Sequence, residues 1–94
     1  MSRAARSTMT EVVDMRRGAI RVSGHLSVQG ADLLRATVET LRRDGHATVV
    51  LDLRELRDVD DAGRQELDDI RHSLAAQGGE LVVVAPPAQL AARP

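Results

Sequence analysis

Residues 49–70, VVLDLRELRDVDDAGRQELDDI, decide the fold of this 94-residue chain. The stretch begins with a nearly continuous apolar run, which is typical of a strand covered on both faces and paired with parallel neighbours. It ends in apolar residues at helical spacing, Leu67 and Ile70, a stripe that Leu74 continues. Residues 58–63 carry three carboxylates and a glycine between the strand and the helix. The stretch therefore predicts a strand–helix unit of an α/β domain, with a charged junction.

Apolar periodicity and the glycine and proline breaks divide the rest of the chain. We expect strands at 9–14, 19–23, 46–53 and 80–85, helices at 29–44 and 62–77, and a short helical fragment at 88–93. The first helix carries an apolar stripe with Leu33 alongside it, and Gly45 is expected to stop this helix. Residues 24–27 are expected to leave the sheet. The order β-β-α-β-α-β-α predicts an α/β domain with a mixed sheet over residues 9–94, after a disordered leader at 1–8.

Composition excludes several classes of function. The net charge is −1 and the chain has no aromatic residue, which argues against a nucleic-acid partner. The absence of cysteine excludes disulfides, thiol catalysis and thiolate metal sites. No apolar run reaches the length of a membrane span, and the first nine residues lack the apolar stretch of a signal peptide. We therefore expect a cytoplasmic protein that does not contact a membrane.

Several motifs together resemble one known family. They are Gly24 and Leu26 after the hairpin, the strand at 49–53, the loop at 59–63 and the run GGELVVV at 78–84. In order and spacing they are similar to the STAS domain of bacterial anti-sigma-factor antagonists, over roughly residues 10–93. The resemblance implies a partner-switching protein in transcription regulation. In that family the residue after the loop aspartate is usually a serine or threonine at the start of a helix. An anti-sigma factor that is also a kinase phosphorylates this residue, and the phosphorylated form does not bind the anti-sigma factor.

The chain departs from the family pattern at the loop and at its end. Asp61 occupies the position of the phosphoacceptor, and its neighbour Ala62 cannot be phosphorylated either. Arg64 stands where the family commonly has an apolar residue, and Ser27 where an aspartate is common. The chain ends where the resemblance leads us to expect a third helix, a fifth strand and a final helix. Either this is a shortened version, or the place of the last strand is empty or filled by a partner.

The carboxylates at 58–63 admit more than one interpretation. Asp60 or Asp61 can cap the second helix, with an oxygen that accepts backbone N–H bonds, and this alone explains one aspartate. Asp61 can also supply a fixed charge of about −1 where a phosphoserine would carry about −1.5 to −2, which makes it a partial mimic. Asp58, Asp60, Gly63 and Asp69 match positions 1, 3, 6 and 12 of a calcium loop. Ala62 at position 5 and the expected helix argue against calcium.

Catalytic signatures are missing from the sequence. His25, His46 and His72 form no zinc motif, and no serine lies in a G-x-S-x-G context. Asp52 lies inside an apolar strand, where it is either a buried acid with a raised pKa or, as we favour, a strand-end residue bonded to loop amides. No nucleophile–base pair can be assembled, so we expect neither an enzyme nor a cofactor or metal.

The absence of catalytic signatures predicts a non-catalytic interaction module, and the resemblance implies that it binds an anti-sigma factor of the serine-kinase type, with the phosphoacceptor replaced by Asp61. Partner contacts are expected at His25, Leu26, Ser27, Asp60, Asp61, Ala62, Gly63, Arg64, Asp68 and Arg71, with His72 on the same helix face. One alternative is a STAS-like subunit that binds the ATPase of an ABC-type lipid transporter. Another is a structural module that forms homodimers through an exposed sheet edge at 80–85.

Overall fold

The computed structural model describes residues 9–85. It contains β1 (Met9–Asp14), β2 (Ala19–Leu26), α1 (Val28–Arg43), β3 (Thr48–Val59), α2 (Asp61–Ala76) and β4 (Glu80–Val84). The element order agrees with the predicted order as far as β4. The leader expected at 1–8 and the helical fragment expected at 88–93 lie outside the described residues.

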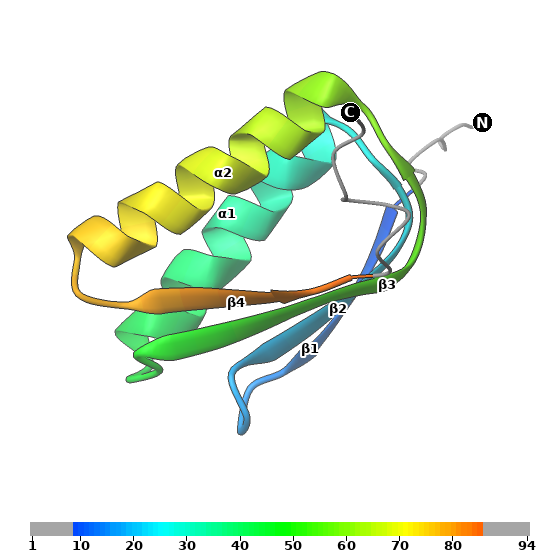
Figure 1. Cartoon of the computed structure of the whole chain (residues 1–94). Helices are drawn as coiled ribbons and strands as arrows, with labels where there is room; N and C mark the ends of the chain where they lie inside the picture. Colours follow the sequence, from blue (N-terminus) through cyan, green and yellow to red (C-terminus); the bar gives the residue numbers. More distant parts are fainter. Residues whose placement is uncertain (1–8, 86–94) are drawn as a thin grey trace.

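The four strands form one mixed sheet in the order β1-β2-β3-β4. β1 pairs with β2 antiparallel as a hairpin, and β2, β3 and β4 are parallel to one another. The predicted α/β class and the parallel neighbours of the central strand are thereby confirmed. Each crossover moves one strand along the sheet in the same direction. Because such connections are right-handed, α1 and α2 lie on the same face of the sheet (Figure 1).

The core lies between these two helices and the face of the sheet that they cover. On β3, Val49, Leu51 and Leu53 are buried, whereas Val50 and Asp52, which alternate with them, are half-buried. The expectation that this strand is covered on both faces is therefore wrong for the described part of the chain. The apolar run at 49–53 arises because three of its residues face the helices and because Val50, on the other face of the sheet, is also apolar. The buried cluster consists of Ile20, Val22, Leu26, Ala31, Leu34, Val38, Leu41, Val49, Leu51, Leu53, Leu56, Leu67, Ile70, Leu74 and Leu81.

Both central strands run further than the sequence predicts. β2 continues to Leu26 instead of leaving the sheet after Ser23, and β3, expected at 46–53, begins at Thr48 and continues to Val59. Their pairing passes through register shifts, one of which lies at Gly24, with a φ of 93° that favours glycine. On β3 the buried residues Leu53 and Leu56 are three positions apart, which breaks the two-residue alternation. Because the alternation is broken, the periodicity of the sequence does not show where either strand ends.

The helices differ from expectation in small ways. Each begins one residue earlier than predicted and ends one residue earlier. Gly45 follows α1 with a φ of 105°, which confirms it as the stop signal of that helix. Leu33 was expected beside the buried stripe, but its side chain is 59% exposed because it lies about 100° around the α1 axis from Leu34. Among residues 9–85, no helix is long and apolar enough to cross a membrane.

Candidate interaction site at the start of α2

Residues 58–63, which we call the β3–α2 junction, lie beside the end of β2. The parallel register places His25 opposite Asp58 and Leu26 opposite Val59. The backbone N–H of Asp60 then donates to the carbonyl oxygen of Leu26 at 3.2 Å. The junction is therefore held by the last residues of β2, which the sequence assigned to a loop.

Asp60 is the N-cap of α2. Its φ of −84° and ψ of 167° are extended, and its Oδ1 accepts the backbone N–H of Gly63 at 2.7 Å. This bond satisfies one of the N–H groups that the first helical turn leaves without a partner. The sequence allows either Asp60 or Asp61 as the cap, and the structure assigns the cap to Asp60.

Gly63 brings the first turn of α2 against the end of β2. A Cβ atom built on Gly63 would lie 2.8 Å from the Leu26 carbonyl oxygen and 3.1 Å from Asp60 Oδ1. Both distances are shorter than nearly all real Cβ contacts, and the carbonyl belongs to backbone that cannot rotate away. A glycine is required here for close approach rather than for backbone conformation.

Asp61 is the first residue of α2 and plays no part in the cap. Its side chain is 98% exposed, and its Oδ1 lies 3.0 Å from a guanidinium nitrogen of Arg64. An ion pair this exposed contributes between about 0 and 1 kcal/mol to stability. The negative charge also lies at the positive end of the helix dipole, which favours it slightly. Asp61 thus presents a carboxylate to solvent at the start of a helix and contributes little to the stability of the fold.

His25 lies between two carboxylates of the junction. Its Nδ1 is hydrogen-bonded to Asp58 Oδ1, and its Nε2 lies 3.8 Å from Asp60 Oδ2. The sequence predicts His25 as a partner contact but does not predict its bond to Asp58, which is not among the predicted contact residues. Only the register of the parallel strands places Asp58 beside His25, so no spacing along the chain could have shown it.

The predicted contact residues separate into three groups. Leu26 is fully buried and Gly63 is buried, so neither residue is accessible to a partner. Both hold the junction in place. Ser27 belongs with these two, because it is half-buried and caps α1, where its Oγ accepts the Gly30 N–H at 3.3 Å. Of the predicted contact residues at or beside the junction, the exposed or half-exposed ones are His25, Asp60, Asp61 and Ala62.

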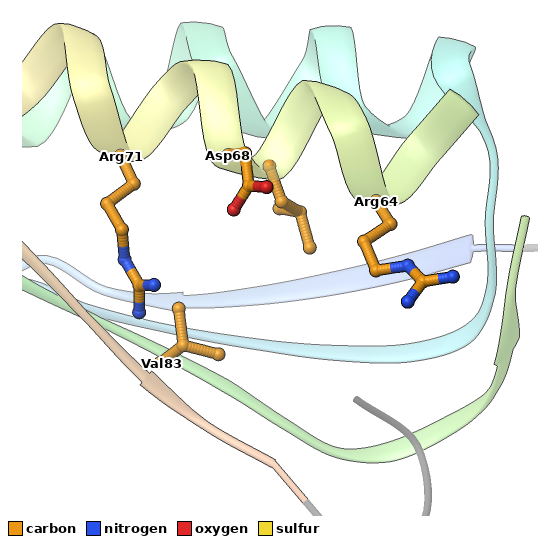
Figure 2. Close-up of a pocket in the computed structure, with 5 residues that line it drawn as sticks. Arg64, Asp68, Arg71 and Val83 are labelled. Carbon is orange, nitrogen blue, oxygen red and sulfur yellow. The ribbon is translucent and has the colours of Figure 1, made fainter. Parts of the chain in front are cut away.

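The third group lies along α2, facing the edge strand. Arg64, Asp68 and Arg71 line a hollow of ≈ 230 Å³ together with Leu67 and Val83 (Figure 2). Val83 belongs to β4, the last strand of the described sheet. His72, expected on the same face, does not line this hollow, and its Nδ1 lies 2.9 Å from the backbone oxygen of Asp68. The predicted surface therefore consists of the junction and of a groove between α2 and β4.

Asp52 behaves differently from both interpretations of the sequence. Hydrogen bonds from the side chain and the backbone N–H of Arg54 lower its pKa to about 2, so the raised pKa of a buried acid is ruled out. It also lies within β3 rather than at a strand end. The Asp52 carboxylate accepts two bonds from the Arg54 guanidinium, at 3.0 and 2.9 Å, on the sheet face that lies away from the helices.

The described part of the chain contains no group of three or more histidine and acidic side chains arranged to hold a metal ion. The calcium-loop alternative also fails on geometry. Because α2 begins at Asp61, Gly63 and Asp69 are helical and cannot curl around an ion.

Comparisons with known proteins give consistent matches. The model of the STAS domain matches residues 8–93. The crystal structure of an anti-sigma factor antagonist from Mycobacterium paratuberculosis is 25% identical, with a TM-score of 0.68, and the match covers 89% of this chain and 74% of that one. A second structure, "Crystal Structure Analysis of Mglu", is also 25% identical, with a TM-score of 0.63. That match covers 78% of this chain, which spans only 19% of the other. No curated protein matches.

Proposed function

Because this chain belongs to the STAS domain family, we propose that it is a non-catalytic interaction module of the anti-sigma-factor antagonist type. Its partner is then an anti-sigma factor, and its site is the exposed part of the β3–α2 junction. The observation that carries the proposal is the position of Asp61. It is the first residue of α2, and its carboxylate is 98% exposed at the point where the resemblance places the phosphoacceptor.

The structural likeness to an anti-sigma factor antagonist supports this choice over the transporter alternative. The geometry of the junction supports it as well. A phosphate on the first residue of a helix is held by free backbone N–H groups and by the helix dipole. Asp61 occupies that place with a permanent charge of about −1, against about −1.5 to −2 for a phosphoserine.

The proposed mechanism follows from this fixed charge. A serine in this place would be neutral until a kinase modified it, so its partner could distinguish two states. Asp61 has no hydroxyl group for a kinase to modify, so it presents its partner with a single state. We infer that the partner of this protein accommodates the carboxylate with a positive or hydrogen-bonding group, and that kinase action at this position does not regulate the complex.

Purified chain and the anti-sigma factors encoded in the source genome provide the test, with affinity measured by isothermal titration calorimetry. Asp61→Asn removes the charge and keeps the shape, and we expect it to weaken binding by about 10- to 150-fold, since a charge-assisted bond contributes about 1.5–3 kcal/mol. Asp69→Asn is the matched control, because Asp69 is an exposed aspartate on the same helix. It should leave the affinity unchanged.

Asp61→Ser adds a second arm to the experiment. Incubated with ATP and an anti-sigma factor kinase, this variant should gain one phosphate by mass spectrometry, whereas the native chain should gain none. If both substitutions at Asp61 left the affinity unchanged and Asp61→Ser stayed unmodified, the junction would not be the switch site. If no anti-sigma factor bound the native chain, the proposed function would be wrong.

A further inference from the structure

A second hollow lies at the end of the domain opposite the β3–α2 junction. It is formed by the loop after α1 and the loop after α2, which lie at the same end of the domain (Figure 1). Its volume is ≈ 200 Å³, and its lining consists of Arg42, Gly45, His46, Ala47, Gln77, Gly78 and Gly79. Both loops lie well inside residues 9–85, and neither contains a residue proposed to contact an anti-sigma factor.

Arg42 brings a charge to this hollow that the described chain does not neutralise. It lies in the last turn of α1, its side chain is half-buried, and its Nε atom is enclosed without a hydrogen-bond partner. Among residues 9–85 no carboxylate lies within ion-pair distance of its guanidinium. Removing a charge from water without a partner costs free energy, and a buried donor without an acceptor is rare in folded proteins. The guanidinium therefore has both the charge and the free donors to bind an anion.

A role of Arg42 as a helix cap does not account for this arrangement. An arginine near a helix C-terminus can donate to the last carbonyl groups of the helix, but within the described chain the Arg42 side chain makes no such bond. Loop N–H groups occupy the nearby carbonyls instead. Gly45 donates to the carbonyl oxygen of Arg42 at 3.0 Å, and Glu80 donates to that of Ala47 at 2.9 Å. The backbone acceptors beside the hollow are thus engaged, so a partner for Arg42 must supply its own acceptor atoms.

The remaining lining suits a small group that accepts hydrogen bonds. Gln77 is exposed, and its side-chain amide can donate as the Arg42 guanidinium does. Gly45 and Gly78 have φ values of 105° and 85°, and a Cβ atom built on either would meet nothing within 4 Å. The two loops therefore leave open space above their backbone. Because the hollow is smaller than the about 300–1,000 Å³ of pockets for drug-sized ligands, it fits a small anion better than a nucleotide.

Arginines are concentrated at this end of the domain. Arg42 and Arg43 lie in the last turn of α1, where cations offset the partial negative charge of a helix C-terminus. The hairpin turn at 15–18 carries two more, and the His46 ring joins this turn to the hollow, with its Nε2 2.7 Å from the Met15 oxygen. The acidic residues at this end are Asp14, Asp44 and Glu80. The excess of positive charge is small, so direct contact with Arg42 must provide most of the affinity for an anion.

We propose that this hollow binds the oxyanion group of a small molecule, a carboxylate or a phosphate, through the Arg42 guanidinium, with the Gln77 amide as a second donor. The planar guanidinium matches two oxygens of either group, which a spherical anion such as chloride does not offer. A bound oxyanion neutralises the half-buried charge of Arg42. The inference goes beyond the proposed function and does not depend on it.

Nuclear magnetic resonance titration of the full ¹⁵N-labelled chain tests the site, with sodium phosphate and sodium acetate as separate probes and sodium chloride to hold the ionic strength constant. We expect saturable shifts of the Gly45, Gly78 and Gly79 amides and of the Arg42 side-chain Nε. Tighter binding of phosphate would assign the site to a phosphate group, and tighter binding of acetate to a carboxylate.

Three variants separate the hollow from general charge. Arg42→Gln should weaken binding at least about tenfold, as expected for the loss of a charge-assisted bond. Arg43→Gln is the matched control, because it removes the neighbouring arginine of the same helical turn, which does not line the hollow. It should leave the affinity unchanged. Arg42→Lys keeps the charge without the planar fork and should weaken binding less than Arg42→Gln does. Far-ultraviolet circular dichroism checks that each variant is folded.

The outcomes that would overturn the site are specific to it. Shifts that sodium chloride reproduced, or an affinity that Arg42→Gln left unchanged, would reject the hollow as an oxyanion site. An equal loss in Arg42→Gln and Arg43→Gln would also reject it, because the anion would then respond only to the charge of this end of the domain. Since Arg42 lies at the opposite end from Asp61, we expect Arg42→Gln to lose phosphate or acetate binding and to keep its affinity for an anti-sigma factor.

Discussion

The two helices of this protein begin with the same local arrangement of residues but differ in the role of that arrangement. Both are 16 residues long, both have a capping side chain before the first helical residue, and both have a glycine three positions after that cap. At α1 the residues are Ser27 and Gly30, and at α2 they are Asp60 and Gly63. The two starts differ in charge and in what their glycines contact.

The start of α1 is neutral and adaptable. Ser27 is half-buried, and the first turn of α1 contains no acidic residue. A Cβ on Gly30 would meet the Sδ atom of Met9 at 2.7 Å, which is the far part of a flexible side chain. The start of α2 carries the charges of Asp60 and Asp61. It is rigid because Gly63 lies against the backbone of Leu26. A capping residue followed three positions later by a glycine can therefore either form an uncharged helix start or hold a carboxylate in a fixed place.

The largest expected effect comes from replacing the two glycines. Gly63→Ala forces its Cβ against the Leu26 carbonyl, and we expect it to lower the free energy of unfolding by about 1–3 kcal/mol, as overpacking does. Gly30→Ala displaces only the Met9 side chain and gains helix propensity, so its net effect should stay within about 1 kcal/mol. Urea unfolding followed by far-ultraviolet circular dichroism measures both, since the chain has no aromatic residue. An equal loss in the two variants would mean that the helix starts are equally rigid.

The caps should give the next largest difference. Asp60→Ala removes an oxygen that accepts the Gly63 N–H at 2.7 Å, whereas Ser27→Ala removes a longer bond of 3.3 Å. We expect each variant to lose about 0.5–2 kcal/mol of unfolding free energy, with the loss larger for Asp60. Asp60→Asn, which retains an acceptor oxygen, should recover most of that loss in the same urea experiment. If Ser27→Ala were the more destabilising variant, the charged cap would not be the stronger one.

A smaller effect is expected at the histidine that serves only the α2 start. His25→Ala leaves the carboxylates of Asp58 and Asp60 without the ring between them, and we expect a loss below about 1 kcal/mol because these groups are partly exposed. His72→Ala is the matched control, since the ring of His72 bonds only to a backbone oxygen of its own helix. Thermal unfolding of both variants checks the order. A loss confined to His72→Ala would contradict the bridging role of His25.

The smallest expected effect on stability concerns the first residue of each helix. Variants at these two positions also test most directly whether the two helix starts differ in function. Asp61→Asn should lower the unfolding free energy by at most about 0.3–1 kcal/mol, the usual size of a charge at a helix N-terminus. Val28→Asp places a carboxylate at the equivalent position of α1 and should raise stability by a similar small amount. Only Asp61→Asn should change the affinity for an anti-sigma factor. If Val28→Asp changed it as much, partner binding would depend on total charge and not on the junction.

Much of the fold was predictable from local patterns. The hairpin, the parallel strands and the two helices followed from residue periodicity, and the glycine after α1 from its position. The cap of α2 was also predictable as one of two aspartates. The ends of β2 and β3 were not, because the register shifts near Gly24 break the alternation on which strand prediction depends.

The candidate site was only half predictable for the same reason. Asp61 is exposed as a sequence argument would place it, but Leu26 was expected on the surface and is fully buried. Its carbonyl oxygen receives the Asp60 N–H and limits the size of residue 63. These contacts join positions more than thirty residues apart, so no local pattern contains them.

The sequence by itself determined the order of the elements and the chemistry at the start of α2. Those features depend on periodicity, turn residues and hydrogen-bonding groups that act over a few residues. Only the tertiary structure decided that both helices cover one face and that β4 ends the described sheet beside a groove of α2. It also brought His25 between Asp58 and Asp60. The reason is that strand register and crossover direction bring together side chains that the chain itself keeps far apart.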